Sequence, residues 1–276
     1  MSRLYRESPA TWRAFAGIKS ASNFHKQTSV RPTSFEDLEE IGPQGQIKHD
    51  DISEGDTYEW RLGTYAKMIR VSRQYLINDD IGFIDGIVNS MGPAAMRTLA
   101  NLIYETLQTP GSFFSNGNKN LITSNPLSVQ GFANALELMR NQQDENGNYI
   151  DTVPTTLVVP PALEKVAKEI LQSDYTEQIT TLADVDNVRG TGNPFKESVR
   201  LEVEPRLSAN PVEWYMFAQP EMAPLAVGFL DGKQTPTVDF LGLDSDPSTL
   251  GVSWRVYHDF GAALGDHRAC LKSDGS

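Results

Sequence analysis

The chain contains little that would support a disulfide, a membrane span or a cysteine-based metal site. Its 276 residues include one cysteine, Cys270, so no disulfide can form within one copy of the chain. No apolar run approaches the ~20 residues that a membrane helix needs. The polar start, residues 1–12, lacks the apolar core of a signal peptide. We therefore expect a soluble protein of a reducing cytoplasm with no membrane partner.

Basic charge is also scarce, and it is unevenly placed. The chain has 24 lysines and arginines against 36 aspartates and glutamates, a net charge of −12, which argues against a dedicated binder of duplex DNA. Residues 1–31 hold six basic residues and one acidic residue, whereas residues 36–56 hold eight acidic residues and one basic residue. This pattern indicates either a solvated tail beside a solvated loop, or the arm of one subunit lying on the acidic surface of another.

Motifs for catalysis or cofactor binding are missing. Gly190 and Gly192 lack the third glycine and the strand–helix context of a dinucleotide-binding loop. The four histidines are not spaced as zinc ligands: they are His25, His49, His258 and His267. We expect no catalytic residue, no cofactor and no metal, and structural hydrogen bonds for the histidines near the C-terminus. Scattered carboxylates that meet in the folded chain leave open a different class, a soluble carboxylate-based hydrolase.

Hydrophobic periodicity predicts a mixed α and β chain. Residues 1–34 show no sustained period and are predicted to form an extended arm with a short helix near 9–15. Residues 35–72 alternate polar and apolar side chains around 58–62 and 65–71, which predicts a long hairpin with its turn at 42–45 or 48–55. Such a ribbon is marginal alone, so we expect it to rest on something else.

The remainder of the chain predicts helices first and strands later. Apolar residues at helical spacing predict a long helix over 83–108, which Pro93 should kink or divide. Ser128 is a candidate N-cap for a shorter helix. The further expected elements are strands at 155–159, 199–203, 212–218, 225–230, 237–241 and 252–258, with a helix opening at 160–161.

This order of elements resembles a known family. A basic arm, a long acidic hairpin, a long amphipathic helix, an α/β body and returning strands are the layout of the major capsid proteins of tailed bacteriophages, the Hong Kong ninety-seven type of fold. Three stretches resemble Mu-like major head subunits: residues 71–80 (VSRQYLINDD), 156–164 (TLVVPPALE), and 254–263 (WRVYHDFGAA) with 266–268 (DHR). The similarity spans nearly the whole chain.

The resemblance implies a fold class and a division of parts. The fold would be α+β, with an N-terminal arm, an extended β-hairpin loop, a long spine helix, and peripheral and axial domains. In residue numbers, the resemblance implies an arm at 1–34, the loop at 35–72, the peripheral domain at 73–114 and 222–276 with the spine helix at 83–108, and the axial domain at 115–221. A scaffolding segment that some relatives carry in front of the arm would be absent or encoded separately.

The implied function is structural rather than enzymatic. The chain would self-assemble, as hexamers and pentamers, into the icosahedral shell of a virion in the host bacterial cytoplasm. Scaffold, portal and decoration proteins would be partners, and packaged double-stranded DNA would lie nearby without being gripped. An encapsulin-type compartment and a tail-tube component stay as alternatives. The residues expected at subunit interfaces are Arg3, Leu4, Tyr5, Arg6, Trp12, Arg13, Phe15, Glu36, Asp37, Glu39, Glu40, Tyr58 and Trp60. Packing against the parent domain is the alternative for the apolar ones, and for Trp60 the two interpretations have equal weight.

Overall fold

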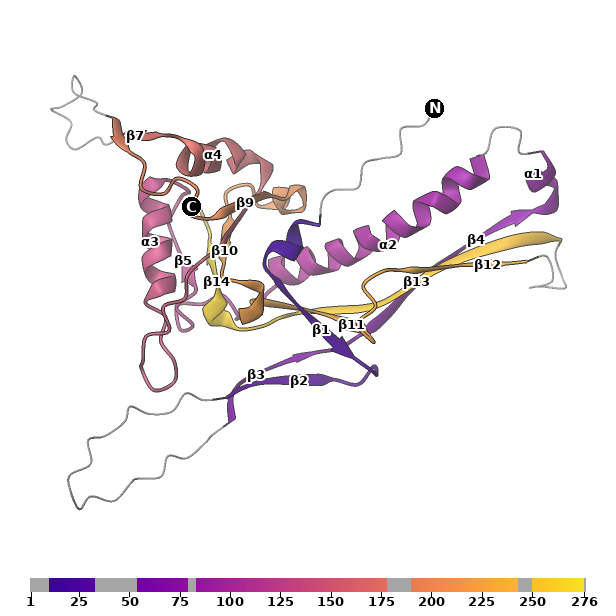
Figure 1. The fold of residues 1–276 in the computed structure, drawn as a ribbon, viewed down its shortest axis with the longest axis horizontal. Coiled ribbons are helices and arrows are strands. Elements are labelled where there is room, and N and C mark those ends of the chain that lie inside the picture. The colour runs from indigo at the N-terminus through magenta and orange to yellow at the C-terminus, as the bar shows by residue number, and fades with distance from the viewer. Residues whose placement is uncertain (1–9, 33–53, 79–82, 178–189, 243–249, 276) are drawn as a thin grey trace, which may run out of the picture.

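A computed structural model describes residues 10–32, 54–78, 83–177, 190–242 and 250–275 (Figure 1). The helices of this part are η1 (Thr11–Ala14), α1 (Arg73–Ile77), α2 (Phe83–Gln108), α3 (Val129–Arg140), η2 (Pro161–Leu163), α4 (Glu164–Gln172), η3 (Pro205–Ala209), η4 (Pro220–Met222) and η6 (His267–Ala269). Its strands are β1 (Ala16–Ala21), β2 (Gln27–Pro32), β3 (Glu54–Trp60), β4 (Gly63–Ser72), β5 (Leu121–Ile122), β6 (Thr156–Val159), β7 (Tyr175–Glu177), β8 (Gly190–Gly192), β9 (Arg200–Val203), β10 (Trp214–Phe217), β11 (Leu225–Leu230), β12 (Thr237–Leu241), β13 (Gly251–Leu264) and β14 (Cys270–Ser273).

The first sheet is organised around β13. This 14-residue strand pairs with β4 along one side, and with β12 and then β11 along the other, all antiparallel. β1 adds to β11 in parallel. Helix α2 runs along one face of this sheet (Figure 1), and its Leu99, Ile103 and Leu107 share a buried cluster with Phe260 of β13. The three helix residues repeat every four positions, which is why the helix presents one apolar stripe to the sheet.

The second sheet has the order β5-β14-β10-β6-β9. Its buried strand residues pack with one face each of α3 and α4. Helix α3 begins where predicted, because the Ser128 hydroxyl accepts a hydrogen bond from the backbone N–H of Gly131 at 3.0 Å. The C-terminal strand β14 lies in this second sheet, between β5 and β10. The resemblance instead implies that all of residues 222–276 belong to the peripheral domain, together with the long helix.

A ribbon formed by β2 and β3 extends from the first sheet (Figure 1). The sequence predicted a hairpin over 35–72, but β3 pairs with the earlier strand β2, and β4 belongs to the first sheet. The expected turn at 42–45 lies outside the described residues. Because a two-stranded ribbon is marginal alone, it depends on its attachment to the body.

Local periodicity located several elements correctly. The helix predicted over 83–108 coincides with α2, and the strands predicted over 225–230 and 237–241 coincide with β11 and β12. Helix α2 continues through Pro93, so the expected division of the helix does not occur.

The region expected to be an extended arm is corrected by the structure. Residues 16–21 form β1 inside the first sheet, and residues 27–32 form one strand of the ribbon. The partner of β1 is β11, which lies about 200 residues later in the chain. Pairing at such a distance leaves no periodic signal in a six-residue segment as mixed as AGIKSA, so the sequence alone did not reveal it.

Candidate subunit interface

The N-terminal segment of the described chain is buried in its own molecule. Trp12 is 1% exposed and Phe15 is 0% exposed. The ring of Phe15 stacks on Phe217 of the second sheet at 4.2 Å and meets Tyr104 of α2 edge-on at 6.3 Å. The cluster around them also contains Phe229 of the first sheet. The segment therefore fills the junction of α2 and both sheets, and Trp12 and Phe15 need no neighbouring subunit to be covered.

A buried chain of hydrogen bonds fastens this segment in place. The Thr11 hydroxyl donates to Oε2 of Glu204 at 2.6 Å, and the Tyr104 hydroxyl lies 2.6 Å from the same Thr11 oxygen. Because Thr11 has one hydroxyl proton and gives it to Glu204, Tyr104 is the donor to Thr11. Burial raises the pKa of Tyr104, which keeps its phenol protonated for this bond.

The Glu204 carboxylate is the centre of this network. Its side chain is fully buried, and its Oε1 accepts a hydrogen bond from Nη1 of Arg206 at 2.8 Å. Nε of Arg206 donates to Asn101 of α2 at 2.7 Å. A buried carboxylate needs such partners, since burial without them is costly. Sequence reasoning missed these residues because they come from three distant segments.

Trp60 attaches the ribbon to the body. It is 6% exposed, and its Nε1 donates to the Ser29 hydroxyl across the ribbon at 3.3 Å. The ring lies against Gly228 of β11 so closely that a Cβ there would come within 2.0 Å of Cζ3. Glycine at 228 therefore provides the room for Trp60. Tyr58, two residues earlier in β3, is half-buried and packs against the small cluster that Trp60 forms with Ala21 and Leu62.

Beyond this attachment the ribbon is open to solvent. Val30 is about half exposed, as is Phe24 at the turn into the ribbon. Lys26 and Glu59 form an ion pair on its surface, which contributes little stability in water. These exposed apolar side chains leave the ribbon with surface that a neighbouring subunit can cover.

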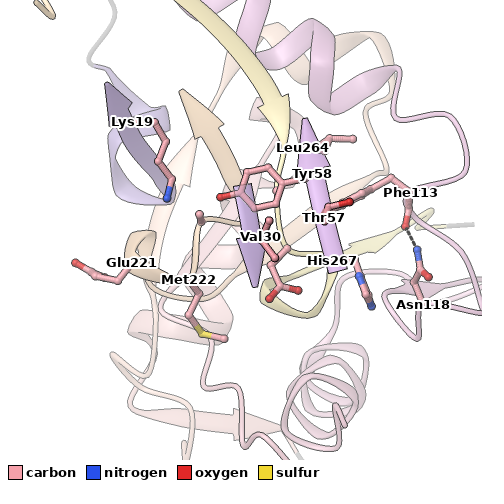
Figure 2. Close-up of a pocket in the computed structure, with 13 residues that line it drawn as sticks. Lys19, Val30, Thr57, Tyr58, Phe113, Asn118, Glu221, Met222, Leu264 and His267 are labelled. Carbon is pink, nitrogen blue, oxygen red and sulfur yellow. Dashed lines mark hydrogen bonds between the residues drawn. The ribbon is translucent and has the colours of Figure 1, made fainter. Parts of the chain in front are cut away.

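A cavity of about 490 Å³ lies where the ribbon leaves the body. Figure 2 shows its mixed lining: Val30 and Tyr58 of the ribbon, Lys19 of β1, Met222 of η4 and His267 of η6. Several separate parts of the chain meet here without filling the space. The cavity thus lies at the root of the ribbon, between the ribbon and the body.

The other expected interface residues divide into two groups. Arg13 is exposed, donates to Gln234 at 3.0 Å and lies over the Trp12 ring at 5.0 Å, so it is held against its own subunit. The remaining residues lie outside the described part of the chain: they are Arg3, Leu4, Tyr5, Arg6, Glu36, Asp37, Glu39 and Glu40.

The residues considered for acid–base or thiol chemistry, His258 and Cys270, are buried in the packed interior. His258 is buried between Phe229 and Phe260, and its Nε2 lies 3.3 Å from the carbonyl of Lys233. Cys270 is buried, and burial raises the pKa of its thiol. The described residues contain no group of three or more His, Cys, Asp or Glu that could hold a metal ion. No helix in this part of the chain is both long and apolar enough to cross a membrane.

Comparisons with known proteins find one matching family model and several solved structures of similar fold. A family model described as phage capsid protein matches residues 56–273. The capsid of a native GTA particle is similar in structure, with a TM-score of 0.64 and 10% identity over 98% of this chain and 91% of that chain. The SrpI encapsulin complex of Synechococcus elongatus PCC 7942 gives 0.61 and 10% over 99% and 89%. A Mycobacterium phage Adephagia structure gives 0.58 and 13% over 96% and 89%. No curated protein matches the chain.

The hydroxyl of Thr11 should matter more than that of an exposed threonine. Thr11→Val removes the donor to the buried Glu204 carboxylate, and we expect it to lower the free energy of unfolding by roughly 1–3 kcal/mol. Thr98→Val on the exposed side of α2 is the matched control, with an expected change within about 0.5 kcal/mol. Urea unfolding of the unassembled chain measures both, and equal losses would contradict the network.

His258 should make stability depend on pH. Burial lowers its pKa below the ordinary value of 6.5, so the unfolded chain takes up a proton that the folded chain resists. The free energy of unfolding therefore falls as the pH drops below about 6.5, until the lowered folded pKa is reached. His258→Asn should reduce the loss of stability between pH 7.5 and 5.0, while His25→Asn, at an exposed position, should not. An unchanged pH dependence in His258→Asn would show that this histidine titrates normally.

Proposed function

This chain belongs to the phage capsid protein family, and we propose that it builds its shell by reaching to neighbours with the segments that its own core leaves uncovered. It is a structural protein of a phage head shell. The observation that supports our proposal is the contrast between a fully buried Trp12–Phe15 junction and an open β2–β3 ribbon. Residues 1–10 and the ribbon would contact adjacent subunits.

The two separate sheets support a division of the subunit. The first sheet with α2 would form the peripheral domain, and the second sheet with α3 and α4 the axial domain, which would line the five-fold and six-fold centres. The ribbon would form part of the extended loop. Permanent interfaces bury ~2,000 Å² or more, so many such contacts would sum to a stable shell.

The negative net charge of the chain supports a shell that binds its contents weakly. With a net charge of −12, most of the subunit surface would repel packaged double-stranded DNA, which then lies nearby without strong binding. Assembly would take place in the bacterial cytoplasm with scaffold, portal and decoration proteins, and the product would be the virion head.

An encapsulin-like compartment is the second candidate, and the similarity to the Synechococcus encapsulin supports it. The two functions differ in content. Particles purified from the cells in which the chain is naturally made would hold DNA in one case and a cargo protein in the other. The match of the phage capsid family model over residues 56–273 favours the head shell.

The basic arm offers a direct test of assembly. Arg3→Glu with Arg6→Glu should lower the yield of closed shells in negative-stain micrographs about tenfold or more, because the arm's charge would no longer favour an acidic neighbour. Arg13 is left intact because it contacts its own subunit. The circular dichroism spectrum should not change.

Arg97→Glu with Lys233→Glu, both exposed and outside the arm, the ribbon and the second sheet, makes the same change in net charge and should preserve the yield. Normal shells from the arm variant would overturn the role of the arm. Absence of shells from the unmodified chain, produced alone and with its neighbouring gene products, would overturn the proposed assembly.

A further inference from the structure

Exposed apolar side chains gather at one end of the first sheet. Tyr75 and Ile77 of α1, Phe240 of β12 and Leu250 beside the start of β13 are each more than 60% exposed. α1, the end of β4 and the start of β13 lie together at the end of the molecule far from the second sheet (Figure 1). The backbone N–H of Arg73 donates to the carbonyl of Leu250 at 3.0 Å, which ties α1 to this end. A concentration of exposed apolar surface of this kind marks an interaction site.

Two open strand edges border this end of the sheet. β4 is ten residues long and pairs with β13 along one edge. No described strand pairs with the other edge of β4. β12 likewise pairs with β13 on one side alone among the described strands. An unpaired edge with exposed apolar side chains is a place where another chain can attach. The sheet therefore has two different flanks, one on each side of β13.

We define the β4 flank as Lys67, Met68, Arg73, Tyr75 and Ile77, all exposed. We define the β12 flank as Val238, Asp239 and Phe240. The Phe240 ring contacts the Trp254 ring in a tilted arrangement, with 5.2 Å between their centroids, and Phe240 is still 61% exposed. Each flank thus combines apolar side chains with charged ones.

The two flanks carry opposite charge. Residues 61–77 contain four basic residues and no acidic residue, and residues 237–242 contain Asp239 and no basic residue. Asp239 pairs with Arg255 of β13 at 2.9 Å and is still one-third exposed. Two β4 flanks brought together would repel, whereas a β4 flank and a β12 flank would attract.

We propose that the β12 flank of one copy docks against the β4 flank of the next copy. This inference rests on the proposed assembly of the chain with itself and names the surfaces that would meet. The contact is head-to-tail, because each copy presents its β12 flank to one neighbour and its β4 flank to the other. Contacts of this type close into a ring when the rotation between copies allows it. The apolar side chains supply burial, and the opposite charges select the pairing of unlike flanks.

A cysteine-pair experiment tests the contact. Within one copy the two flanks are separated by β13, so their strands lie about 10 Å apart, too far for a disulfide. We would combine Lys67→Cys, Met68→Cys or Tyr75→Cys with Val238→Cys or Phe240→Cys in the full chain. Mild oxidation of assembled protein should give disulfide-linked multimers larger than dimers with at least one of the six pairs. Each single-cysteine variant should stay uncrosslinked, since its cysteine would face an unmodified flank.

The outcomes separate this contact from shell formation itself. If shells form and none of the six pairs crosslinks, or if single-cysteine variants form dimers, the head-to-tail contact is overturned. If the pairs crosslink although no shell forms, the contact stands and the proposed shell assembly fails. Cys270 is buried and can stay in place in all variants.

Charge reversal gives a second, independent readout. Lys67→Glu with Arg73→Glu should lower multimer yield about tenfold or more, because the two positive charges of the defined β4 flank would become two negative charges facing Asp239. Arg97→Glu with Lys233→Glu, at exposed positions of α2 and of the turn after β11, changes the net charge equally outside both flanks, and should change the yield less than about twofold. Equal yields from the two variants would overturn the selection by charge.

Discussion

The fold depends on the burial of residues 11–15 where the two sheets and α2 meet. Trp12 and Phe15 fill this junction with apolar volume, and the hydroxyl of Thr11 links it to the Glu204 carboxylate. With this segment in place, the largest apolar side chains at the front of the chain are already covered. What is left for neighbouring copies is the surface that the core cannot reach: the ribbon, the end of the first sheet and its two open edges.

This constraint explains how one subunit can be both a stable body and a building block. The core inside each copy does not have to be completed by a neighbour, so contacts between copies can differ in angle without breaking the fold. The cavity at the ribbon root and the attachment of the ribbon through Trp60 and Tyr58 fit this arrangement. Similarity in fold to phage, GTA and encapsulin shells at 10–13% identity shows that this architecture survives near-complete change of sequence.

Elements with their own periodicity could be predicted, and those defined by distant pairing could not. The stripe of α2, the Ser128 cap and the apolar run of β11 are local signals, and each was located correctly. β1 was missed because its partner is β11. The interface residues show the same limit: Trp12 and Trp60 looked available for a neighbour, but tertiary packing buries both. The two flanks could not be predicted either, because strand order alone brings 61–77 and 237–242 to opposite sides of one strand.

Hydrogen exchange on the unassembled chain tests the central claim most directly. If residues 11–15 and β1 close the subunit from within, the amides of β1 that pair with β11 should be as strongly protected before assembly as those of β13. Protection of the ribbon would rise on assembly alone. Rapid exchange throughout β1 in the free chain, with protection appearing only in shells, would show that this segment is held by a neighbour and would contradict the account.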